Sequence, residues 1–471
     1  MADLHSDAFV FFGATGDLAY KQIFPALQSL IQHGQLDLPI IGVAKSGWNL
    51  HRLRERARDS LKHHGGVDKR AFETLSARLD YVDGDYQEKS TYKLLRQALG
   101  SAKQPLHYLA IPPSMFATVA AHLAESGCAN NARVVIEKPF GRDLSSAQAL
   151  DCTLHDYFPE SAIFRIDHYL GKEAVQNLLY FRFANSFLEP IWNHEHIQSI
   201  QVTMAEEFGV QGRGKFYEEV GAIRDVVQNH LLQVMVLLAM DPPASSDAVC
   251  IRDEKIRIMR AIRPLEPKCV VRGQFQGYRR ELGVSSDSRV ETFAALCFYI
   301  DNWRWAGVPF YIRAGKLLPV TATEVFVSLK NPPHAVFDEA VPNRPNYFRF
   351  RLSPDFVISL GARIKAGGEA MVGEEVELIA HEDTATDHRM LPYMRLLGDA
   401  MRGDPTLFNR QDAVEAAWRV IDPVLGNITP LHEYAPHTWG PIEADAIAAD
   451  IGGWHNPRRS ENPPVRLAKG F

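Results

Sequence analysis

Cysteine is scarce in this chain of 471 residues, and no two of its five cysteines form a CxxC pair. The five positions are odd in number and widely spaced: Cys128, Cys152, Cys250, Cys269 and Cys297. This arrangement predicts free thiols in a reducing compartment, rather than a disulfide framework or a zinc site.

Long hydrophobic runs and excess positive charge are missing as well. The longest apolar run, residues 231–240, is about half the length that a membrane-spanning helix needs. Residues 1–17 have no basic segment before the first apolar run, so they predict a first strand rather than a signal peptide. The net charge of −6 disfavours nucleic acid and anionic membranes as partners. We expect a cytoplasmic protein with neither partner.

The first part of the chain alternates short apolar strands with helical segments. Strands are predicted at 8–13, 38–45, 78–85, 106–113 and 133–141, and a helix at 18–34. Continuous apolar strands separated by helices are typical of a parallel, doubly wound sheet. We predict an α/β Rossmann-like dinucleotide-binding domain over residues 1–165.

Beyond about residue 195, strands follow one another with few helices between them. They are predicted at 197–209, 292–303, 308–316, 323–330, 346–354 and 355–366. Helices at 170–182, 219–240 and 409–421 are expected to cover one face. This pattern predicts an α+β domain with a large, mainly antiparallel sheet, and we assign substrate binding to residues 166–471.

A glycine-rich turn follows the first strand. In FFGATGDLA, residues 11–19, Gly13, Gly16 and Ala19 form a G-x-x-G-x-x-A pattern between a strand and a helix. Gly13 would permit the tight turn, and Gly16 would let a pyrophosphate approach the backbone N–H groups at the helix start. The predicted dinucleotide loop consists of Gly13, Ala14, Thr15, Gly16, Asp17 and Leu18.

The end of the second predicted strand indicates which dinucleotide binds. NAD sites usually place an acidic residue there, but this chain has Lys45 and Ser46, a cation and a hydroxyl suited to a 2′-phosphate. NADP is favoured, with NAD as the weaker alternative. The predicted cofactor residues also include Asp85 and Tyr86 after the third strand, and Lys138 at the end of the fifth, where the following X-Pro bond can be cis.

Two further segments contain several side chains that can bind an anion or transfer a proton. RIDHYLGKE, residues 165–173, is either a solvated loop or a site that holds an anion and orients a base; if it is helical, His168 and Lys172 share a face. In GAIRDVVQNHLLQ, residues 221–233, Asp225 and His230 lie in an otherwise apolar helix. Five residues of α-helix turn by about 500°, so the two side chains are expected to point roughly 140° apart. Spacing alone does not decide their roles.

Several motifs, taken in chain order, resemble the glucose-6-phosphate dehydrogenase family. They are FFGATGDLA, EKPFGRDL, RIDHYLGKE, FYEEVGAIRDVVQNH and VPFYIRAGK, followed near the C-terminus by DAMRGDPTLF, EAAWRVIDPVL and YAPHTWGP. The family oxidises C1 of a hexose 6-phosphate to a lactone and transfers hydride to NADP without a metal. The resemblance implies the entry step of the oxidative pentose phosphate pathway, and a homodimer or homotetramer.

The resemblance also implies a role for individual residues. His230 is the general base, and Asp167 is the carboxylate that orients it and stabilises the imidazolium. The expected substrate-binding residues are His168, Tyr169 and Lys172 for the sugar phosphate, Glu206 and Asp225 for sugar hydroxyls, Lys316, and Lys138 between substrate and nicotinamide.

Two departures from the family pattern keep alternatives open. Gln22 and Thr321 stand where the family usually has basic residues on the substrate side. The protein could then be a dehydrogenase of another hexose phosphate or a catalytically silent NADP-binding paralogue. A third alternative is an oxidoreductase of the same plan in which Lys138 is the acid/base and His230 is dispensable.

Overall fold

The computed structural model describes residues 5–334, 336–337, 345–381 and 390–459. The chain forms two compact units. The first consists of Met1–Glu173, Pro243–Ile256 and His388–Trp418, and the second of Ala174–Pro242, Arg257–Asp387 and Arg419–Phe471. The first unit thus also takes in residues 166–173, 243–256 and 388–418, which the sequence pattern grouped with the second domain. In the last of these segments, β15 (Phe408–Asn409) pairs with the first sheet and α11 (Pro392–Arg402) packs against α1 (Phe24–Gln32).

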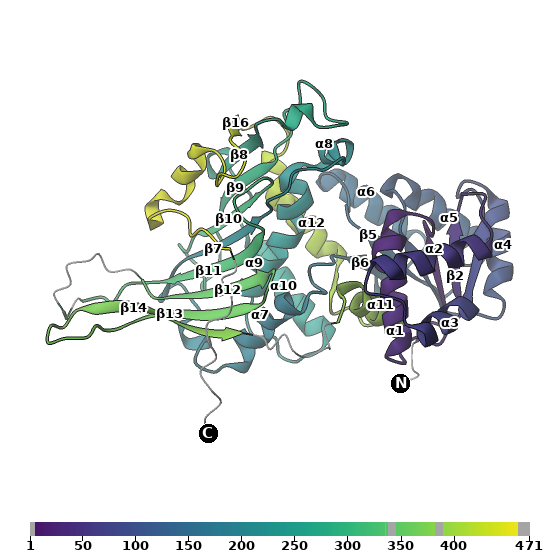
Figure 1. Ribbon diagram of the computed structural model, residues 1–471, viewed down its shortest axis with the longest axis horizontal. Helices are drawn as coiled ribbons and strands as arrows, with labels where there is room; N and C mark the ends of the chain where they lie inside the picture. The colour runs from purple at the N-terminus through teal and green to yellow at the C-terminus, as the bar shows by residue number, and fades with distance from the viewer. Residues whose placement is uncertain (1–4, 335, 338–344, 382–389, 460–471) are drawn as a thin grey trace. The chain divides into compact units, whose positions relative to one another are not determined.

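A seven-stranded sheet forms the centre of the first unit, in the order β15-β6-β5-β4-β1-β2-β3 (Figure 1). All neighbouring strands are parallel except β15, which runs antiparallel to β6. The strands are β1 (Ala8–Phe12), β2 (Ile40–Ala44), β3 (Leu79–Asp83), β4 (Pro105–Leu109), β5 (Arg133–Glu137) and β6 (Ile163–Ile166). The predicted parallel, doubly wound sheet is confirmed; the sequence pattern missed the short strands β6 and β15.

Helices of the first unit bury their apolar faces in one core. Phe9, Phe11 and Leu106 from the sheet pack there with Leu27 of α1 and Leu396 of α11. Besides α1 and α11, the helical segments are η1 (Ala19–Ile23, a π-helix), α2 (Leu50–His63), α3 (Lys69–Arg78), α4 (Lys89–Leu99), η2 (Pro113–Met115), α5 (Phe116–Glu125), α6 (Leu144–His155) and η3 (Glu160–Ala162).

A nine-stranded sheet forms the second unit, in the order β14-β13-β12-β11-β7-β10-β9-β8-β16 (Figure 1). Its neighbours are antiparallel except for the pairs β7–β10 and β8–β16, so the predicted, mainly antiparallel sheet is confirmed. The strands are β7 (Ile197–Ala205), β8 (Val270–Phe275), β9 (Phe293–Phe298), β10 (Phe310–Gly315), β11 (Ala322–Leu329), β12 (Tyr347–Ser353), β13 (Val357–Lys365), β14 (Gly373–His381) and β16 (Leu431–Tyr434). The sequence pattern missed β8, β14 and β16.

The helix predicted over 219–240 is divided into three segments. They are α8 (Gly214–Ala222), the π-helix η5 (Ile223–Leu231) and α9 (Leu232–Ala239), and η5 packs against β10. The remaining helical segments are α7 (Glu173–Ala184), η4 (Glu189–Ile191), α10 (Ala248–Ala261), η6 (Pro267–Cys269), η7 (Tyr278–Arg280), α12 (Gln411–Ile421), η8 (Asp422–Val424) and η9 (Ile442–Ile451). Within the described residues, none of the helices has the length and apolar character to span a membrane. The five cysteines are free thiols.

Candidate active site

The residues predicted to bind the cofactor lie at one edge of the parallel sheet. The loop 13–18 follows β1, Lys45 and Ser46 follow β2, Asp85 and Tyr86 lie just beyond β3, and Lys138 follows β5. The strand order reverses between β1 and β4. Open α/β sheets bind their ligands at the carboxyl ends of the strands at such a reversal.

The turn after β1 requires glycine at its first position. Gly13 has φ +78°, and a Cβ there would lie 2.2 Å from the backbone oxygen of Ala110. The Gly13 N–H donates to the Val43 carbonyl at 2.9 Å and lies 3.0 Å from the Tyr86 hydroxyl. The helix begins directly behind the turn, since Asp17 and Leu18 are already helical before η1. The turn therefore has the tight glycine position and the adjoining helix start that are typical of a pyrophosphate site.

Lys45, which is predicted to bind the 2′-phosphate, is paired with Asp85, another predicted cofactor residue. The Lys45 amine lies 2.6 Å from the Asp85 carboxylate, and this hydrogen bond raises the pKa of Lys45. Asp83, which sequence reasoning did not single out, accepts the backbone N–H groups of Ser46 and Gly47 at 3.0 and 2.9 Å. The loop after β2 is thus held in place by two carboxylates from the end of the third strand and the turn that follows it.

The RIDHYLGKE segment is a turn between β6 and α7, so the helical spacing of His168 and Lys172 does not apply. Asp167 is 1% exposed, and its Oδ1 accepts the backbone N–H of Tyr169 at 3.0 Å. The Lys172 amine lies 3.9 Å from the centre of the Tyr169 ring. The turn therefore gathers a buried carboxylate, an imidazole and an ammonium group within six residues.

Buried ion pairs hold the strand that leads into this turn. Arg165 on β6 is fully buried and donates to Asp151 at 2.6 Å and to Glu160 at 2.9 Å. Asp167 has a charged neighbour of its own in Lys255 of α10, which is 6% exposed. Burial lowers the pKa of Lys255 to about 8, and the negative charge of Asp167 opposes that shift. Sequence reasoning missed Lys255 because only the fold brings α10 beside Asp167.

In the second unit, three predicted substrate residues surround a buried tyrosine. The Lys316 amine forms an ion pair with Glu206 at 2.5 Å and lies 5.6 Å from the centre of the Tyr217 ring. Burial raises the pKa of Tyr217 well above its usual value, and the charges of Asp225 and Glu206 raise it further. Tyr217 is therefore a member of this cluster that sequence reasoning did not identify.

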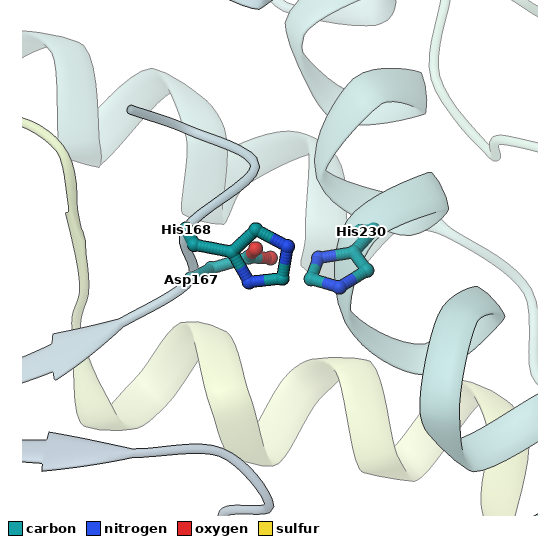
Figure 2. A group of neighbouring side chains, drawn as sticks. All are labelled: Asp167, His168 and His230. Carbon is teal, nitrogen blue, oxygen red and sulfur yellow. The ribbon is translucent and has the colours of Figure 1, made fainter. Parts of the chain in front are cut away.

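Asp225 and His230 both lie on the π-helix η5, which corrects their predicted separation of about 140°. Hydrogen bonds in a π-helix run from i to i+5, so residues five apart lie on nearly the same side. Figure 2 shows His230 on this helix, and Asp167 and His168 on the turn after β6. His230 is 4% exposed. The structure thus places a carboxylate and an imidazole on one side of a buried helix.

The direction of this helix is set at a glycine. Gly221 has φ +61°, and a Cβ there would lie 2.5 Å from the carboxylate of Glu291. That same carboxylate accepts the backbone N–H of Ile223 at 3.2 Å. Gly221 thus interrupts the helix, and Glu291 binds the first turn of the π-helix.

The two residues that depart from the family pattern, Gln22 and Thr321, have uncharged side chains. Gln22 is exposed on η1. The Thr321 hydroxyl accepts the backbone N–H of Glu207 at 3.0 Å, next to Glu206. Thr321 therefore supports the loop that carries a predicted substrate residue.

The glycine turn, the parallel sheet and the edge that carries Lys45 and Lys138 define a Rossmann-type dinucleotide-binding protein with an α+β second unit. The model of the glucose-6-phosphate dehydrogenase NAD-binding domain matches residues 10–177, and the model of its C-terminal domain matches residues 179–455. The chain belongs to the glucose-6-phosphate dehydrogenase family, as its motifs predicted.

Relatives named glucose-6-phosphate dehydrogenase match nearly the whole chain. Glucose-6-phosphate 1-dehydrogenase 1 of Mycobacterium tuberculosis is 43% identical over 457 residues, which is 96% of this chain and 97% of the relative. The crystal structure of glucose-6-phosphate 1-dehydrogenase from Mycobacterium avium is 42% identical with TM-score 0.90, covering 97% of this chain and 100% of that one. A glucose-6-phosphate dehydrogenase solved with its substrate glucose-6-phosphate is 35% identical with TM-score 0.89, at the same coverage.

Proposed function

We propose that this protein oxidises glucose 6-phosphate at C1 to 6-phosphogluconolactone and transfers the hydride to NADP. The observation that carries the proposal is the match of both family domains along the chain, with each proposed catalytic residue in its motif. The relative solved with glucose-6-phosphate supports the substrate. In this role the enzyme performs the entry step of the oxidative pentose phosphate pathway.

His230 is the proposed general base. Its neutral imidazole accepts the proton of the C1 hydroxyl as the hydride leaves C1, a role that suits a group titrating near neutral pH. Asp167 is the proposed carboxylate that orients this imidazole and stabilises the imidazolium. Two observations support these roles: both side chains are shielded from water, and Asp167 Oδ1 accepts the Tyr169 N–H at 3.0 Å, which fixes the carboxylate in the turn.

The remaining site residues are proposed to hold the sugar phosphate. His168, Tyr169 and Lys172 bind the phosphate group, to which the two potential cations and the phenol offer charge-assisted donors. Glu206 and Asp225 accept hydrogen bonds from sugar hydroxyls, because ionised carboxylates act as acceptors only. Lys316 also binds substrate, and its ion pair with Glu206 supports that role.

NADP is the proposed cofactor. The loop 13–18 would hold its pyrophosphate, Lys45 and Ser46 its 2′-phosphate, and Asp85, Tyr86 and Lys138 would complete the site. The tight turn at Gly13, with φ +78° and a backbone close to that of Ala110, fits this assignment. When bound, the nicotinamide accepts the hydride. NAD is kept as the weaker alternative. Lys45 would bind a 2′-phosphate only as a point charge and is already paired with Asp85, so use of both dinucleotides is expected more than in an enzyme with arginine at this position.

We also propose a homodimer or homotetramer that works in the cytoplasm and needs no metal. One relative, from Solanum tuberosum, is 37% identical and is named a cytoplasmic isoform. A second candidate function is the oxidation of a different hexose phosphate. It is favoured because positions 22 and 321, where the family usually has basic residues, are Gln22 and Thr321 in this chain.

An initial-rate assay of nicotinamide reduction tests the proposal. NADP and NAD are each supplied with glucose 6-phosphate, free glucose or other hexose phosphates. We expect turnover with NADP and glucose 6-phosphate, and His230→Asn should lower kcat by about 10²- to 10⁴-fold while NADP still binds.

Two outcomes would contradict the proposal. If NADP binds but only another sugar phosphate is oxidised, the second candidate function holds. If Lys138→Ala abolishes turnover while His230→Asn remains active, Lys138 is the acid/base of the reaction.

A further inference from the structure

A carboxyl group with no role in the proposed mechanism lies next to Lys138. Glu137 is the last residue of β5, and the hydroxyl of Tyr108 on the neighbouring β4 donates to its Oε1. Tyr393 on α11 makes a second side-chain hydrogen bond to the same carboxyl group. One carboxyl group thus joins two strands of the sheet to a helix that is remote in the sequence.

Tyr393 extends this contact to the substrate turn. Its ring stacks on that of His168, with the centroids 6.3 Å apart and the planes at 12°. Glu137 precedes Lys138 in the chain and binds Tyr393, which contacts His168. The carboxyl group of Glu137 therefore links Lys138 and His168, two proposed site residues on different loops. Moving Glu137 or Tyr393 would disturb both loops.

Glu137 itself is partly exposed, but both tyrosines that bind it are shielded from water. Tyr108 is fully buried and Tyr393 is 8% exposed. Burial raises the pKa of Glu137 to about 7, although the hydroxyls of Tyr108 and Tyr393 and the charge of Lys138 lower it; the charge of Asp167 raises it further. The charged groups that act on Glu137 are therefore themselves proposed site residues.

We infer that Glu137 is a positioning residue: with Tyr108 and Tyr393 it holds the strand end that carries Lys138 and the ring of His168 in place. The inference rests on the proposed function. Because Lys138 is proposed to lie between substrate and nicotinamide, loss of Glu137 should lower kcat. Because His168 is proposed to bind the phosphate, loss of the Tyr393 hydroxyl should raise KM for the sugar phosphate.

Steady-state kinetics of Glu137→Gln, Tyr393→Phe and the double variant test this role. We expect Glu137→Gln to lower kcat about ten-fold or more and Tyr393→Phe to raise KM for glucose 6-phosphate several-fold, with the NADP dissociation constant within about two-fold of its original value. The double variant should lose less than the product of the single effects, because both changes break the same contact.

A tyrosine–aspartate contact in the second unit supplies the matched control. The Tyr311 hydroxyl donates to Asp450 at 2.7 Å, and Tyr311→Phe removes a hydrogen bond of the same kind away from the proposed site residues. It should lower the melting temperature at most, with kcat and KM unchanged.

If the Glu137 and Tyr393 variants behave like this control, Glu137 is merely structural and the inference is overturned. In that case the unmodified enzyme still turns over glucose 6-phosphate, and the proposed function stands. Lack of turnover by the unmodified enzyme would instead overturn both.

Discussion

Arg165 offers the sharpest test of how the substrate turn is supported. Its guanidinium is fully buried and makes bonds of 2.6 and 3.1 Å to Asp151, which is 2% exposed. Glu160, its other partner, also accepts the backbone N–H of Gln411 at 2.9 Å. Arg165→Met keeps most of the side-chain volume but removes the charge. Asp151 then loses both bonds to the guanidinium while it remains buried.

Two estimates of the cost agree. Removing one partner of a buried ion pair lowers the free energy of unfolding by about 3–5 kcal/mol. Alternatively, Asp151 becomes protonated; with an ordinary pKa of 3.8, this costs about 1.4 kcal/mol per pH unit, or about 4 kcal/mol at pH 7. At pH 5 the same protonation costs about 2 kcal/mol. The folded variant then holds a proton that its unfolded chain releases, so the loss of stability grows as the pH rises.

Urea unfolding at pH 5 and pH 7 measures this loss of stability. The transition is monitored by hydrogen exchange in peptides of the first unit. Arg419→Met is the matched control, because its guanidinium donates to backbone carbonyls of Arg260 and Ile262 at 2.9 and 3.1 Å. Its cost should be the same at both pH values. Adding Asp151→Leu to Arg165→Met should recover much of the stability. A loss below about 1 kcal/mol, or one that does not change with pH, would refute the reasoning.

Two further predictions concern the ligands. Asp85→Asn keeps an acceptor for the Gln87 N–H but removes the ion pair with Lys45. The ratio of kcat/KM for NADP to kcat/KM for NAD should therefore rise about two- to five-fold. An equal change with both dinucleotides would contradict this prediction. Gln22→Lys restores a cation where the family usually has one, so it should lower KM for glucose 6-phosphate about three- to ten-fold with kcat unchanged. An unchanged KM in initial-rate measurements would show that position 22 does not act on the phosphate.

The sequence alone was sufficient for the parallel character of the first sheet, the mainly antiparallel character of the second, the glycine turn and the family. Strand periodicity is a local property: the apolar runs at 8–13 and 38–45 recur as β1 and β2. The demand for glycine at position 13 is likewise visible in the motif, although the atom that enforces it is the Ala110 oxygen. Short strands such as β15 could not be predicted, because two residues carry no periodic signal.

Other features were decided only by the tertiary structure. The angle expected between Asp225 and His230 assumed an α-helix, whereas the chain after Gly221 forms a π-helix that brings the two residues to nearly the same side. The contact of Glu137 with Tyr393 joins segments that lie far apart in the sequence. Sequence patterns record which faces are buried, but the groups that meet there depend on how distant segments pack.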